Sequence, residues 1–97
     1  MSAAAVAKGD STIVLSGSVT FPNIVALRAR VESLLQAMKG NVKIDFADVS
    51  ALDSSALSLW LCCLRLAKAQ GLSLTAVSVP EQMQQFSSVV GLESEFI

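Results

Sequence analysis

Segments with the periodicity of a strand alternate along this chain with segments with the periodicity of a helix, and this order limits the folds available to it. Strands that are separated by helices need crossover connections, and such connections make neighbouring strands parallel. The sequence therefore predicts a single α/β domain, with a central, mostly parallel sheet of about four strands and helices mainly on one face. The predicted strands are residues 12–16, 42–46 and 72–77, and the predicted helices lie at residues 22–39, 54–70 and 80–89.

The sequence also predicts the extent of the domain and the compartment of the protein. The domain is expected to span residues 1–97, with residues 1–10 (MSAAAVAKGD) as a frayed start, because they are small and mixed and do not resemble a secretory signal. The longest nearly uninterrupted apolar run, residues 56–64, is too short to cross a bilayer. Cys62 and Cys63 are adjacent in a predicted helix, where a mutual disulfide is rare, so we expect free thiols in a cytoplasmic protein.

Composition excludes several classes of function. The net charge is −1, and the seven Lys and Arg residues are scattered, so a nucleic-acid partner is not expected. The chain has no His and no Tyr, and neither phosphate-binding glycine motif is present, so we predict no enzyme and no cofactor. Asp45, Asp48 and Asp53 could gather around a hard cation, but acids in loops usually cap and turn the backbone, and no metal site is expected.

The predicted helix at residues 54–70 is apolar almost all the way round, whereas a helix in a small domain normally keeps one polar side. On a helical wheel, one side is a sheet-facing core and the opposite side is a stripe that is polar at its ends and apolar in the middle. An exposed stripe of this kind is typical of a docking surface, although a neighbouring helix covering it, or a single exposed leucine, is the alternative. The core side comprises Ala56, Leu59, Trp60, Cys63 and Ala67, and the stripe comprises Ser54, Ser58, Leu61 and Arg65, flanked by Leu57, Leu64 and Cys62.

Three polar residues, Asp53, Ser54 and Ser55, stand at the start of this helix. At least one of them is expected to cap the helix by accepting a hydrogen bond from a free backbone N–H. Three such residues exceed what one cap needs, so a hydroxyl is left beside the stripe. A phosphate on that hydroxyl would add about −1.5 to −2 charges, which a partner fitted to a neutral hydroxyl would not accept.

With these residues in view, the chain resembles the STAS domain family, the fold of anti-sigma factor antagonists. Residues 42–61 (VKIDFADVSALDSSALSLWL) look like the central strand of the family, its short loop and the D-S/T-S/G-G-L motif that opens the next helix. Residues 71–96 look like the following strand, helix and C-terminal G-L-x-x-x-F. The match covers residues 11–96.

The resemblance implies one of two roles. In antagonists of anti-sigma factors, a kinase phosphorylates the second hydroxyl of the motif, which matches Ser55. In the small cytoplasmic STAS subunit of the Mla phospholipid ABC transporter, the start of this helix binds the ATPase subunit, and the hydroxyl that is important there matches Ser54. Either serine is thus a candidate for phosphorylation, and the partner is an ABC ATPase or, alternatively, an anti-sigma factor kinase.

One departure from the motif favours the second of these roles, with the antagonist kept as the alternative. Ala56 stands where the family has a Gly that lets a partner or kinase approach closely, which argues against regulated phosphorylation of Ser55. The apolar character of the helix suits a lasting interface better than a transient switch. We therefore expect a non-catalytic transporter subunit that reaches the inner membrane through its partner and does not insert directly. The partner-binding residues expected from this reading are Asp53, Ser54, Ser55, Leu57, Ser58, Leu61 and Arg65.

Overall fold

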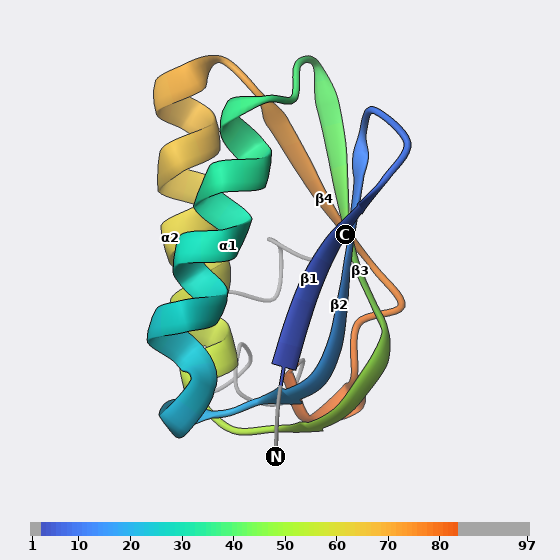
Figure 1. The fold of residues 1–97 in the computed structure, drawn as a ribbon, viewed down its shortest axis with the longest axis vertical. Coiled ribbons are helices and arrows are strands. Elements are labelled where there is room, and N and C mark those ends of the chain that lie inside the picture. Colours follow the sequence, from blue (N-terminus) through green and yellow to red (C-terminus); the bar gives the residue numbers. More distant parts are fainter. Residues whose placement is uncertain (1–2, 84–97) are drawn as a thin grey trace.

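Two α-helices lie side by side against one face of a four-stranded sheet (Figure 1). The computed structural model describes residues 3–83. The strands run in the spatial order β1-β2-β3-β4, with β1 antiparallel to β2 and the other two pairs parallel. This confirms the predicted α/β fold with helices on one face. The elements are β1 (Ala3–Lys8), β2 (Thr12–Val19), the 3-10 helix η1 (Phe21–Asn23), α1 (Ile24–Gln36), β3 (Asn41–Leu52), α2 (Ser55–Gln70) and β4 (Ser73–Val77).

The fourth strand of the sheet comes from the segment that was expected to be frayed, so that expectation is wrong for Ala3–Lys8. The segment forms a hairpin with β2 through a turn at Gly9, whose φ of 73° is favourable for glycine. Ala5 is buried beneath α1, and its carbonyl accepts a hydrogen bond from Arg30 Nε of α1 at 3.1 Å. The strand was missed because Ala has little preference for strands, and backbone pairing and contact with α1 hold this segment instead.

The helix predicted at residues 22–39 is shorter at both ends. It begins as the 3-10 helix η1 at Phe21–Asn23, and α1 proper starts at Ile24. Helix α1 ends at Gln36 and not close to Gly40, because Ala37 and Met38 continue as a tight turn with i→i−3 hydrogen bonds. Helix α2 ends at Gln70 and is capped by Gly71 as predicted; there φ is 74° and the backbone N–H donates to carbonyls of the last turn.

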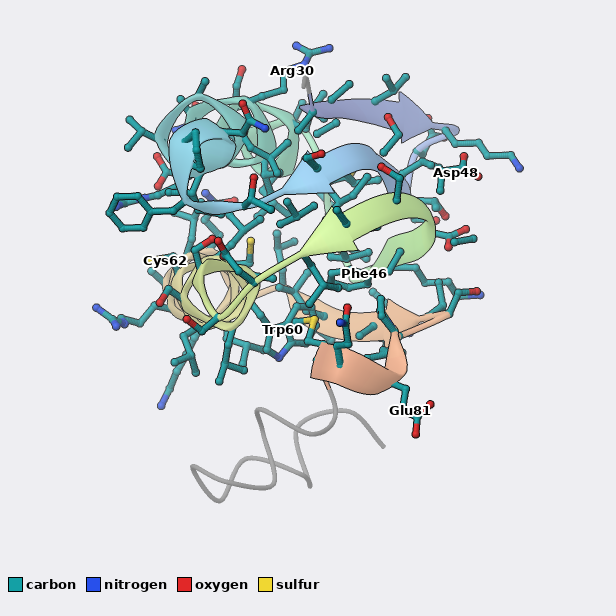
Figure 2. All side chains as sticks on the ribbon, turned by 90° about the horizontal axis from the view of Figure 1, so that it is seen from below. Arg30, Phe46, Asp48, Trp60, Cys62 and Glu81 are labelled. Atoms are coloured by element: carbon teal, nitrogen blue, oxygen red, sulfur yellow. The ribbon has the colours of Figure 1, made fainter. Side chains whose placement is uncertain are left out.

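The core lies between α2, α1 and the sheet. Trp60 of α2 is 1% exposed and meets Phe46 of β3 in an edge-to-face arrangement, with ring centroids 6.4 Å apart (Figure 2). The five residues assigned to the sheet-facing side of α2 are all buried, which confirms the wheel. The predicted helix from residue 80 extends into residues 84–97, which lie outside the described part. Among residues 3–83, no helix is long and apolar enough to cross a membrane.

Candidate docking surface

The turn between β3 and α2 is held by the carboxylate of Asp53. Its Oδ1 accepts hydrogen bonds from the Ser55 backbone N–H at 2.9 Å and from the Ser55 hydroxyl, and its Oδ2 accepts one from the Phe21 backbone N–H at 3.0 Å. The bond to the Ser55 N–H satisfies a free donor at the start of α2, so Asp53 does the capping that the sequence predicts for this trio. The Ser55 hydroxyl and then the Phe21 amide hold the pKa of Asp53 below its ordinary value of 3.8.

The two serines of the motif have different environments. Ser54 is exposed, and its side chain makes no capping hydrogen bond. Ser55 is only 9% exposed, and its hydroxyl is directed to the Asp53 carboxylate. A molecule approaching the start of α2 therefore meets Ser54 first, while Ser55 serves the turn.

The outer stripe of α2 is at the surface, but two of its predicted flanking residues pack inward. Ser58 and Arg65 are exposed and Leu61 is half-buried. Leu57 is only 7% exposed, which corrects the expectation that it belongs to a surface patch. Leu64 packs against the core cluster, so the apolar part of the stripe is smaller than the wheel suggested.

Two exposed apolar residues extend the surface beyond α2. Phe21 of η1 is 77% exposed and Val25 of α1 is 79% exposed. The Asp53–Phe21 hydrogen bond places η1 next to the start of α2. Sequence reasoning missed both residues, although Val25 stands outside the buried stripe of its own helix, which was the available signal. We call Phe21, Val25, Ser54, Ser58, Leu61 and Arg65 the docking face.

A groove between α1 and α2 continues the docking face. Its first section has a volume of about 330 Å³ and is formed by residues of both helices, including Val25, Ser58 and Cys62. A second section of about 440 Å³ shares Cys62 with the first and reaches Arg65. Along its rim, Arg28 Nε and Glu32 Oε1 form an exposed ion pair at 2.8 Å. The groove is thus apolar inside and charged at its edge, as is common for protein-binding surfaces.

Asp45, Asp48 and Asp53, the three acidic residues that could have gathered around a cation, have different environments. Asp53 is engaged in the turn, Asp45 accepts a hydrogen bond from the Ala47 N–H at 2.9 Å, and Asp48 is exposed on β3. Within residues 3–83, no group of three or more Cys, Asp or Glu side chains is placed to hold a metal ion.

Replacing Asp53 by Asn is expected to destabilise the domain by about 1 kcal/mol at neutral pH, because Asn cannot accept all three hydrogen bonds. A carboxyl whose pKa is lowered on folding contributes stability above its unfolded value of 3.8, and this contribution is lost as the pH falls through the lower folded value. Thermal melts of both proteins from pH 7 to pH 2 should therefore converge at the acidic end. A gap that stays constant over this range would contradict the assigned role of the charge.

The two adjacent cysteines are expected to differ in reactivity. Cys63 is buried, and burial raises its pKa to about 12, so almost none of it is thiolate at neutral pH. Cys62 is half-exposed and lies in the groove between α1 and α2 (Figure 2). Iodoacetamide at pH 7.5 should label Cys62 in the native protein and both residues after denaturation, as read by peptide mass spectrometry. Equal native labelling of the two residues would show that the burial of Cys63 is not maintained in solution.

Comparison with solved structures shows that this fold is a known one. The structure is similar to the anti-sigma factor antagonist SpoIIAA in its unphosphorylated form, with a TM-score of 0.75 and 17% identity over 98% of this chain and 85% of that one. It is also similar to the Bacillus cell fate determinant SpoIIAA in the phosphorylated form, with a TM-score of 0.72 and 18% identity over 98% of this chain and 88% of that one. At these identities, the likeness shows the fold.

Sequence comparison identifies the family itself. No curated protein matches the chain. A family model described as "Mlab, STAS domain" matches residues 2–97, which is nearly the whole chain. The chain therefore belongs to the STAS domain family that this model describes.

Proposed function

We propose that this protein is a non-catalytic STAS subunit that binds the ATPase of a phospholipid ABC transporter through the docking face. In this role it supports a transporter that maintains the lipid asymmetry of the outer membrane, and it works in the cytoplasm, held at the inner membrane by its partner. The family description, which names Mlab, agrees with this role.

The observation that carries the proposal is the contrast between the two serines at the start of α2. Ser54, which matches the hydroxyl important for ATPase binding in the transporter branch, is exposed beside Ser58 and Leu61. Ser55, which matches the phosphorylated hydroxyl of the antagonist branch, is buried and bonded to Asp53. A kinase would have to break this bond and expose the hydroxyl before it could transfer a phosphate. The geometry therefore favours docking at Ser54 over modification at Ser55.

The apolar part of the docking face supports the same role. Phe21 and Val25 are more than three quarters exposed, at 77% and 79%, and Val25 lines the groove beside Ser58. Exposed large apolar side chains next to a groove are typical of a surface that another protein covers. A subunit that stays with its partner gains from such residues, whereas a free monomer gains nothing from exposing them.

An anti-sigma factor antagonist is the second candidate, and the likeness of the fold to both forms of SpoIIAA favours it. Under this alternative, the same docking face would bind an anti-sigma factor kinase, and Ser55 would carry the phosphate. Intact mass measured on protein from the native host, grown under several conditions, tests this candidate. A species about 80 Da heavier that maps to Ser55 supports it, and its absence under all conditions counts against it.

The test of the proposal is affinity capture from the native host, followed by identification of the captured proteins. Recovery of an ABC ATPase together with its permease supports the transporter role, and recovery of a kinase-like anti-sigma factor contradicts it. The Cys62 thiol provides a direct readout of the site, because it lies in the groove. Iodoacetamide labelling of Cys62 should fall at least about tenfold when the purified ATPase is added in excess of its dissociation constant.

A further inference from the structure

The docking face is built from two segments that are far apart in the sequence, and Asp53 joins them. Asp53 lies in the turn between β3 and α2 and makes two hydrogen bonds to the segment before α1. Its backbone N–H donates to the Val19 carbonyl at 3.3 Å, and its Oδ2 accepts from the Phe21 N–H at 3.0 Å. These bonds lie on either side of Thr20 and hold the start of η1 against the start of α2.

The rest of η1 is held by its own backbone and by β2. Pro22 restricts its own φ, the Asn23 N–H donates to the Thr20 carbonyl at 2.9 Å, and the Asn23 side chain donates to a carbonyl of β2 at 3.0 Å. The Phe21 N–H stands at the start of this short helix, where no preceding turn supplies an acceptor. The Asp53 carboxylate is therefore the group that fixes the backbone of residue 21.

The size of the Phe21 side chain is not explained by the fold. The side chain is 77% exposed and lies outside the described core cluster. An aromatic ring that is fixed by its backbone and left in solvent suits an interface, where aromatic residues are common hot spots. Because the backbone that carries the ring is already ordered, binding through the ring costs less conformational entropy.

We propose that Phe21 is the aromatic anchor of the docking face and that Asp53 is its positioning residue. The ring enters an apolar pocket on the ATPase, and the carboxylate sets the direction of the ring by holding the backbone N–H. Both roles rest on the proposed function. They add to it a contact region that lies 32 positions before Asp53 in the sequence.

Asp53→Asn separates the two tasks of this carboxylate. The Asn side chain has one acceptor oxygen, and its other terminal group is an NH2 donor. Oδ1 of Asp53 accepts two hydrogen bonds from Ser55, so the Asn oxygen is best placed there. The NH2 group then faces the Phe21 N–H and cannot accept from it. The start of α2 stays capped, and the contact with Phe21 is lost.

Amide hydrogen exchange, followed by NMR on the free chain, measures this selective loss without a partner. In Asp53→Asn, exchange of the Phe21 N–H should accelerate at least about threefold relative to that of the Ser55 N–H. The two nitrogens lie 3.0 Å and 2.9 Å from oxygens of the same carboxylate, so loss of its charge alone affects both similarly. Equal changes at the two amides, or no change at Phe21, would contradict the positioning role.

A double-mutant cycle with the purified ATPase, measured by isothermal titration, tests the role in binding. Phe21→Ala should weaken binding at least about tenfold. Asp53→Asn should weaken it about three- to tenfold, because the anchor is no longer preorganised. The chain with both changes should bind within about twofold of Phe21→Ala, since the orientation of residue 21 no longer matters without the ring. Phe21→Ala changes an exposed side chain and should melt as the unaltered chain does.

Arg65→Ala provides the matched control cycle. Arg65 is exposed and belongs to the docking face, but it lies about 15 Å along α2 from the start of the helix. The effects of Arg65→Ala and Asp53→Asn should multiply to within about twofold. A loss of stability or a disturbed start of α2 would multiply with either partner change, so only positioning makes the Phe21 cycle differ from the Arg65 cycle.

The results separate the two proposals. If the ATPase does not bind the unaltered chain, the proposed function is wrong, and the binding role of Phe21 is wrong with it. If the ATPase binds but Phe21→Ala has no effect, or if the effects of Phe21→Ala and Asp53→Asn multiply, the positioning role alone is overturned. Docking of the ATPase at Ser54 stands in that case.

Discussion

Replacing Ser54 by Arg is expected to weaken binding of the ATPase by about 100-fold or more while leaving the fold intact. Ser54 is exposed at the start of α2 and its side chain makes no capping hydrogen bond, so the domain itself loses nothing that the residue provides. In the complex, an added charge would be buried without a partner, and its desolvation costs several kcal/mol. Binding is measured by isothermal titration with the purified ATPase, and folding by thermal melt.

Three further variants make this test decisive. Ser54→Asp should also lose binding, although its charge is neutral or mildly favourable to an isolated helix start. Leu61→Glu should do the same from the half-buried centre of the stripe. Ser73→Arg makes the same change as Ser54→Arg at an exposed serine on β4 and should bind normally. Stable Ser54 and Leu61 variants that bind as the unaltered chain does would end the docking proposal, and an unfolded Leu61→Glu would mean that this side of α2 belongs to the core.

Replacing Trp60 by Ala is expected to cost about 3–5 kcal/mol of the free energy of unfolding. Trp60 is 1% exposed and packs edge-to-face against Phe46, so its removal leaves a large cavity between α2 and the sheet. For a domain of this size, such a loss lowers the melting temperature by more than about 12 °C. Differential scanning calorimetry measures both quantities.

Trp60→Phe is the control, because it keeps an aromatic ring beside Phe46 and should cost clearly less than Trp60→Ala. A melting temperature of Trp60→Ala within about 2 °C of the unaltered chain would contradict the position of Trp60 in the core. Comparison with Ser54→Arg then separates the two sides of α2: the inner side changes stability, and the outer side changes binding.

The sequence alone predicted the elements that have a strong local pattern. The alternation of Val42, Ile44 and Phe46 identified β3, and the spacing of apolar residues identified α1 and α2, since a buried face imposes its period on the chain. The left-handed residue at Gly71 is an equally local requirement. The motif of Asp53, Ser54 and Ser55 was also readable, because capping depends on residues that are close in the sequence.

Tertiary structure decided everything that depends on contacts between distant segments. The strand β1 has no pattern of its own and exists because β2 pairs with it and Arg30 of α1 bonds to Ala5. The same reason explains Phe21, which joins the docking face only because Asp53, 32 positions later in the chain, holds its backbone N–H. The difference between Ser54 and Ser55 has this origin as well: adjacent residues of one chemical type receive opposite burial from the packing of η1, β3 and α2 around them. Periodicity records which face of an element is buried, but it carries no information about which other element covers that face or leaves it open.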